Sequence, residues 1–250
     1  MLGQYGSFTV VLVDQTGARL FAIQQGEVRE ESEIVGEIVK RHKQSGRSRA
    51  TFQRKTDMQV LHNMRIAAEA VTEFCQGEAC QKIVLAGSEG LLTQFAEMLP
   101  RHLQKEIIGN ITADMTTSPS SILARGMGLW QAWKREQENE LVEQLVTAAA
   151  KGEPAALGLA DTLYAAHQGQ VHILLVERDY ETSGVRCDAC GYVGAAGERQ
   201  CLFCGGSVHP VDNAVDLAVH QTLASGGSAM VLADNERLAE AGHIGAILRY

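Results

Sequence analysis

The sequence has no apolar run long enough to cross a membrane, and it lacks the start of a secreted protein. A bilayer needs about 18 consecutive apolar residues, and no stretch of the 250-residue chain comes near that length. The opening MLGQYGSF has neither the basic nor the apolar region of a signal peptide. We therefore expect a soluble, cytoplasmic protein with no membrane partner, whose six cysteines bind metal more often than they form disulfides.

The chain also lacks the side-chain sets on which most hydrolytic active sites depend. Its histidines stand singly, and no Ser–His–Asp set or carboxylate pair can be argued from residue spacing. Aromatic residues make up only 5% of the composition, so the core must consist mainly of Ala, Val, Leu and Ile. The formal net charge of −8 argues against a surface that is basic throughout, and we expect no DNA partner.

One basic segment stands out against this acidic composition. No acidic residue occurs between Glu37 and Asp57, and Ser45-Gly46 in its middle is a turn signal. Because charge neutralisation by phosphate does not depend on base sequence, the segment predicts an exposed loop that contacts RNA and leads into a helix. A solvated surface without a ligand is the plainer alternative. The candidate RNA-binding residues are Lys40, Arg41, His42, Lys43, Ser45, Gly46, Arg47, Arg49, Arg54 and Lys55.

Apolar periodicity predicts alternating strands and helices along the first half of the chain. The expected elements are two strands within residues 7–25, a helix capped by Asp57, a strand at 82–87, a helix stopped by Pro100 and a strand at 107–112. This order favours an α/β domain with a mixed sheet.

The second half repeats the α/β pattern after a long helix at 118–150, whose polar later part reads as a connection. We place the boundary inside this helix, which gives domains 1–132 and 133–250. The expected later elements are helices at 154–167, 213–224 and 235–241 and strands at 170–176, 229–234 and 244–250.

Two paired cysteine motifs are the strongest chemical signal in the sequence. Cys187 and Cys190 form one C-x-x-C motif, Cys201 and Cys204 form another, and each pair is followed by glycine. Two such turns supply a closed tetrahedral set of four thiolates, the usual arrangement for structural zinc. Four unrelated thiols, a thioredoxin-like pair and an iron–sulfur cluster remain alternatives, because spacing alone does not separate them.

Three separated segments resemble archaeal and eukaryotic class 1 peptide-chain release factors and their bacterial relatives. Residues 40–54, KRHKQSGRSRATFQR, are similar to the family's central loop, which reads roughly K-x-H-x-x-G-G-Q-S-x-x-x-F-x-R. VLVDQTGARLF is similar to the opening hairpin, and the final AGHIGAILRY is similar to the closing strand. The cysteine pairs stand where archaeal members carry a zinc minidomain. The matching loop positions are His42, Gly46, Ser48, Phe52 and Arg54.

The resemblance covers essentially the whole chain and implies a fold for each half. The first half would be a ribonuclease-H-like central domain. The second would be an α/β/α domain related to kink-turn-binding ribosomal proteins, with a zinc ribbon inserted at 184–209. In the family this last domain docks a translational GTPase. The family's codon-reading domain has no counterpart in this sequence, so we expect no stop-codon recognition.

The family's catalytic Gly-Gly-Gln is replaced here by Ser45-Gly46-Arg47. Serine restricts the backbone where glycine is free, and arginine only donates hydrogen bonds where glutamine donates and accepts. We therefore expect no catalytic residue, and a factor that binds the ribosome through contacts to ribosomal RNA or to tRNA without releasing peptide. It would act in ribosome rescue or hibernation at the A site. A peptidyl-tRNA hydrolase or tRNA nuclease using the altered loop is the alternative, and an adaptor away from the ribosome is a third.

Overall fold

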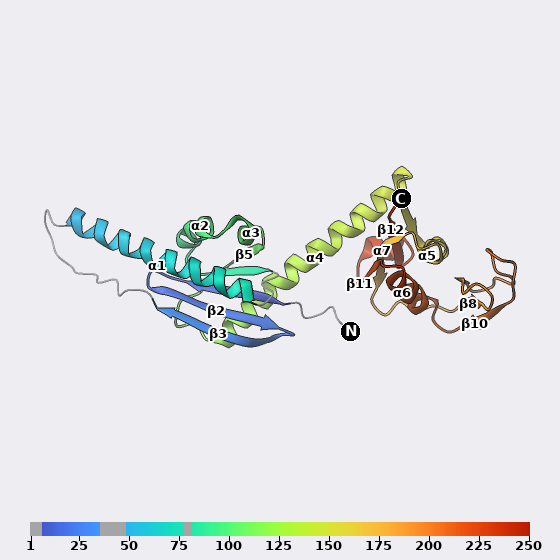
Figure 1. The fold of residues 1–250 in the computed structure, drawn as a ribbon, viewed down its shortest axis with the longest axis horizontal. Helices are drawn as coiled ribbons and strands as arrows, with labels where there is room; N and C mark the ends of the chain where they lie inside the picture. The colour runs from blue at the N-terminus through green and yellow to red at the C-terminus, as the bar shows by residue number, and fades with distance from the viewer. Residues whose placement is uncertain (1–6, 36–48, 78–81) are drawn as a thin grey trace. The chain divides into compact units, whose positions relative to one another are not determined.

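The structure is a computed structural model that describes residues 7–35, 49–77 and 82–250. The chain divides into two compact units, Met1–Lys134 and Arg135–Tyr250. The long helix α4 (Pro119–Lys151) contributes its first turns to one unit and its later turns to the other (Figure 1). Among the described residues, no helix combines the length and the apolar character that a membrane span requires.

The first unit is built on a five-stranded mixed sheet with the order β3-β2-β1-β4-β5. The pairs β1–β2 and β2–β3 are antiparallel, whereas β1–β4 and β4–β5 are parallel. The predicted mixed α/β fold is therefore confirmed. The strands are β1 (Phe8–Val13), β2 (Gly17–Gln24), β3 (Glu27–Val35), β4 (Ile83–Ala86) and β5 (Ile107–Ile111).

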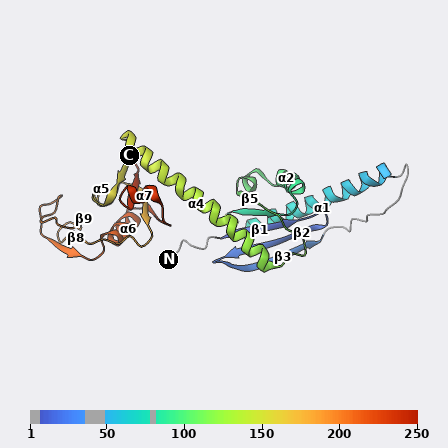
Figure 2. The ribbon, with the colours of Figure 1, turned by 180° about the vertical axis from the view of Figure 1, so that it is seen from behind.

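Helices cover both faces of this sheet. One face packs against α1 (Arg49–Gly77), α2 (Glu89–Met98) and α3 (Arg101–Gln104), and the start of α4 crosses the other face (Figure 2). Alternate residues of β1 divide between the two cores, with Val11 and Val13 on the α1 side. Because both faces are covered, all six residues of β1 are buried, as expected for a central strand.

Helix α1 begins earlier than the sequence predicts. It starts at Arg49, so the prediction that Asp57 caps it is wrong. Residues 49–56 contain neither glycine nor proline. A helix that is already nucleated by packing extends through such residues at little cost.

The second unit has a four-stranded sheet with the order β11-β7-β12-β6. Helices α5 and α6 pack on one face, and α7 and the later part of α4 pack on the other. The cores therefore lie between helices and sheet, as in the first unit. The elements are β6 (Ala155–Leu157), α5 (Gly158–His167), β7 (Val171–Glu177), α6 (Ala214–Ala224), β11 (Ser228–Leu232), α7 (Glu236–Glu240) and β12 (Ile244–Leu248).

A small antiparallel sheet is inserted between β7 and α6. Its order is β10-β8-β9, and it is built from β8 (Gly184–Cys187), β9 (Val193–Ala195) and β10 (Val208–Val211). This sheet and its loops carry all four cysteines of the paired motifs. We call residues 184–211 the cysteine module.

Candidate functional site

The four cysteines of the module converge on one point. Their sulfur atoms all lie within 4.8 Å of one another, with Sγ–Sγ distances of 3.5 Å for Cys187–Cys204 and 3.4 Å for Cys190–Cys201. A metal about 2.3 Å from four tetrahedral sulfurs would place those sulfurs just under 4 Å apart. The cluster therefore fits a single four-coordinate ion, and the cysteine sulfurs predicted from the sequence are brought together.

Each cysteine pair is held by a local turn. The Gly191 amide donates to the Cys187 carbonyl over 3.1 Å, and the Gly205 amide donates to the Cys201 carbonyl over 3.0 Å. Both glycines have positive φ, +75° and +69°, which side chains with a Cβ rarely adopt. The Phe203 amide also points at the Cys201 sulfur, 3.4 Å away. The local sequence thus shapes two similar turns that present sulfur to the same centre.

The four sulfurs are crowded, and each influences the pKa of its neighbours. A backbone hydrogen bond from Cys190 is the main cause that lowers the pKa of Cys187 to about 6. A backbone hydrogen bond from Tyr192 lowers the pKa of Cys190, but burial and hydrogen bonds to Cys201 and Cys204 outweigh it and raise the value to about 12. A cation at the centre would favour thiolate at every position.

A cluster of aromatic rings attaches the cysteine module to α5. Phe203, in the second cysteine turn, stacks on Tyr164 with ring centroids 4.8 Å apart and contacts His167 at 4.4 Å. His167 also meets the edge of buried Tyr192 at 5.4 Å. Burial lowers the pKa of His167, which favours its neutral form. Sequence reasoning missed these anchors, because α5 and the module lie far apart in the chain.

The module is also fastened to α6 and braced from within. The Gln221 side chain of α6 donates to the Gly191 carbonyl over 2.8 Å. The Glu198 carboxylate accepts from the Tyr192 hydroxyl at 3.3 Å and from the Ala195 amide at 3.1 Å. Burial, followed by the nearby Glu198 charge, raises the pKa of Tyr192 and keeps the phenol neutral. The cysteine module is therefore a supported part of the second unit.

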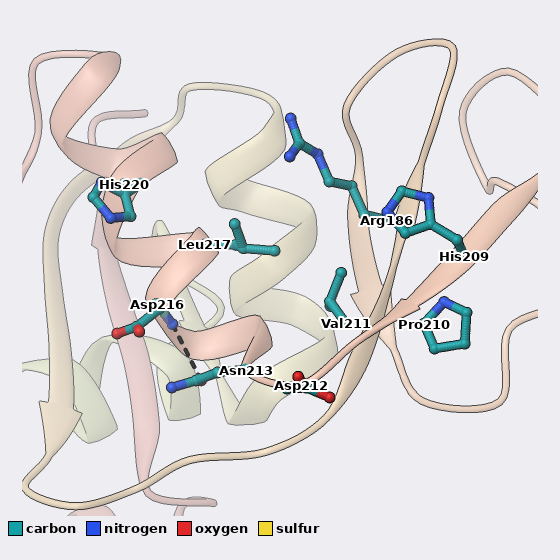
Figure 3. A pocket seen from close by; sticks show the side chains of 9 residues that line it. All are labelled: Arg186, His209, Pro210, Val211, Asp212, Asn213, Asp216, Leu217 and His220. Carbon is teal, nitrogen blue, oxygen red and sulfur yellow. Dashed lines mark hydrogen bonds between the residues drawn. The ribbon is translucent and has the colours of Figure 1, made fainter.

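A pocket of about 500 Å³ lies beside the module, between its strands and α6 (Figure 3). His209 lies 2.8 Å from the Asp188 carboxylate, and Asn213 caps α6 by accepting from the Val215 amide. The lining mixes cations and anions, so it favours no ligand of one charge. Its side chains are Arg186, His209, Pro210, Val211, Asp212, Asn213, Asp216, Leu217 and His220.

Most of the predicted RNA-binding residues lie outside the described part of the chain. The structure describes the backbone of Arg49 in α1 and the exposed side chains of Arg54 and Lys55. The predicted residues outside it are Lys40, Arg41, His42, Lys43, Ser45, Gly46 and Arg47. The RNA-binding loop therefore stays a prediction.

Solved structures with a similar fold come from archaea and yeast. A ribosome-bound archaeal Pelota, in a model with ABCE1, is 19% identical with a TM-score of 0.58, covering 97% of this chain and 61% of that chain. Dom34 of Saccharomyces cerevisiae, described as a translation termination-like factor in RNA quality control that interacts with Hbs1, is 12% identical with a TM-score of 0.56, covering 97% and 63%. These likenesses show the fold, and this chain spans less than two thirds of either protein.

Sequence comparison adds the family. No curated protein matches the chain. Residues 1–129, however, match the model of the bacterial archaeo-eukaryotic release factor family 10. That segment is more than half of the 250-residue sequence and contains the whole basic segment. The predicted relationship to release factors is thus confirmed, and the protein belongs to the bacterial archaeo-eukaryotic release factor family 10.

Proposed function

We propose that the protein is a cytoplasmic translation factor that binds the ribosomal A site in rescue or hibernation without hydrolysing peptidyl-tRNA. The observation that carries the proposal is the family match over residues 1–129, in which the basic segment is retained while Gly-Gly-Gln is replaced by Ser45-Gly46-Arg47. Affinity for RNA needs the cations, whereas hydrolysis needs the tripeptide. The segment therefore keeps the means of binding without the means of catalysis.

Two domains would divide this task. The strand order β3-β2-β1-β4-β5, with helices on both faces, supports a ribonuclease-H-like central domain at 1–132 that carries the RNA-binding loop. The domain at 133–250 would dock a translational GTPase. Dom34, which shares the fold, is described as interacting with Hbs1, and that description is consistent with a protein partner for this protein.

The four cysteines would hold one structural zinc ion in a zinc ribbon. The support is the donor set: four sulfurs within 4.8 Å of one another, on two turns with the same local hydrogen bonds. Four sulfur ligands would complete a tetrahedral site, so none of its positions would be left for a substrate. Zinc would stiffen the module for its partner and perform no chemistry. A single iron ion in the same four sulfurs is the competing assignment, which metal analysis separates from zinc.

The proposed function is tested by co-sedimentation with purified ribosomes. The protein is expected to pellet with ribosomes at moderate salt and to move to the supernatant at high salt, because counterion release weakens phosphate contacts as salt rises. Omitting ribosomes controls for aggregation. A protein that stays in the supernatant at moderate salt, at every ribosome concentration, contradicts the proposal.

The non-hydrolytic part has its own test. Incubation with peptidyl-tRNA or deacylated tRNA, with and without ribosomes, is expected to yield neither free peptide nor cleaved tRNA. Arg47 cannot accept the hydrogen bond that a glutamine amide accepts, and Ser45 narrows the backbone conformations of the loop. Released peptide would support a hydrolase instead, and tRNA fragments would support a nuclease.

A further inference from the structure

The described side chains in the first half of α1 lie outside the buried core, which Val60 alone of them touches as a partly buried apolar residue. Of the side chains that the structure describes between Arg54 and His62, none is buried, and burial begins at Asn63 and Met64. Figure 1 shows these first turns running past the ends of the strands, and Figure 2 shows the same from behind. Isolated helices of this length are marginal in water. Because its described side chains are not buried, the extension adds little to the core. A binding partner would explain why this exposed helix is present.

Three exposed residues of this extension, together with exposed Arg65 just beyond it, lie on one narrow face. Arg54, Met58, Leu61 and Arg65 follow one another at steps of four, three and four, which places them within about 60° around the helix axis. Met58 is 71% exposed and Leu61 is 38% exposed, and both arginines are exposed. We call these four residues the α1 stripe. It has an apolar centre with a guanidinium at each end.

The charge around the α1 stripe is positive in a protein whose net charge is −8. From Arg54 to Arg65 the only acidic residue is Asp57, against two arginines and Lys55. The first turn of α1 contains no acid, so nothing there offsets the positive end of the helix dipole. A polyanion complements the positive charge of this surface. An acidic protein partner would also complement the charge, but charge alone would not explain the apolar centre of the stripe.

We propose that the α1 stripe docks on ribosomal RNA, which deepens and rests on the proposed ribosome binding. Arg54 and Arg65 would contact phosphates on two backbone segments, since the 11 helical steps from one to the other span about 16 Å. Met58 and Leu61 would cover riboses or base edges between those segments, because the minor groove of RNA is wide and shallow. Two apolar side chains are too few to insert a helix into a bilayer, so RNA fits this surface better than an anionic membrane.

The test measures affinity for purified ribosomes as a function of salt for three variants. Arg54→Ala with Arg65→Ala is expected to weaken binding at least tenfold and to reduce the slope of log affinity against log salt by about 1.5 to 2, because two phosphate contacts are lost. Met58→Ala with Leu61→Ala is expected to weaken binding about three- to tenfold with the slope unchanged, since no ion is released there. Alanine preserves the helix, and circular dichroism checks that it does.

The matched control is Arg101→Ala with Lys105→Ala, which removes two exposed cations elsewhere in the same unit and is expected to leave affinity and slope unchanged. The inference is overturned if both α1 stripe variants bind like the wild type while the wild type binds ribosomes. It is also overturned if the wild type binds phosphatidylglycerol vesicles but not ribosomes, and the α1 stripe variants no longer bind the vesicles. A wild type that binds neither probe overturns the proposed function itself.

Discussion

The variant Cys201→Ser is expected to lose its metal and to unfold the cysteine module while the four-stranded sheet of the second unit stays folded. Serine removes one of four converging sulfurs, and structural zinc sites contribute on the order of 10 kcal/mol to the folding of small modules. The small β10-β8-β9 sheet buries few apolar side chains of its own, chiefly Tyr192 with the two buried cysteines. Without the ion, we expect that this core is too small to hold the turns together.

The measurement pairs metal analysis with limited proteolysis. Wild type is expected to carry about one zinc ion per chain, and Cys201→Ser less than about a tenth of that, with new cleavage confined to the module. Leu202→Ser is the matched control, because Leu202 lies between two cysteines of the same turn but is 67% exposed. Full metal content and protection in Cys201→Ser would contradict the assignment of Cys201 as a ligand, and bound iron would contradict zinc.

Acidification is expected to have the same effect as the substitution. A metal ion in this site requires four deprotonated cysteine sulfurs. The backbone hydrogen bond from Tyr192 lowers the pKa of Cys190, but burial and hydrogen bonds to neighbouring thiols outweigh it and raise the pKa to about 12, so this thiol is protonated near neutral pH. Binding therefore displaces protons near neutral pH, and affinity for metal falls as the pH falls because protons compete for the sulfurs. Metal retention against a chelator measures this from about pH 8 to about pH 5. Retention that does not change with pH would contradict thiolate ligation.

Neutralising the basic segment is expected to reduce ribosome affinity by at least a hundredfold. Replacing Lys40, Lys43, Arg47 and Arg49 by alanine removes four cations from a segment without acids. If each contacts a phosphate, the slope of log affinity against log salt falls by about three. Ribosome co-sedimentation across a salt series measures both quantities on the same samples.

Four exposed cations elsewhere provide the control for this result. Alanine at Arg101, Lys105, Lys151 and Arg178 changes the net charge by the same amount without touching the basic segment. This control is expected to bind within about twofold of the wild type, because general attraction between exposed charges is largely screened at moderate salt. Equal losses in both variants would show that overall charge, and no specific loop, governs binding.

Several elements could be predicted from sequence because their signals are local. The apolar run of β1 predicts a central strand, and the structure covers both of its faces. The expected helix at 213–224 corresponds to α6, whose first turn is capped by Asn213. Strand β3 was missed, because its sequence EVREESEIV is rich in glutamate and resembles a solvated segment. It forms because β2 offers it a complete antiparallel partner at the sheet edge.

In the candidate metal centre, the shape of the turns has a local cause, whereas their anchoring depends on distant segments. The C-x-x-C spacing and the following glycines by themselves determine two turns with sulfur on the inside, because each turn is closed by hydrogen bonds within a few residues. The anchoring of those turns to Tyr164, His167 and Gln221 depends on packing between segments far apart in the chain. Sequence periodicity likewise did not predict that the start of α1 extends beyond the core. A helical pattern records which face is apolar, and only the tertiary packing determines where along the helix that face is covered.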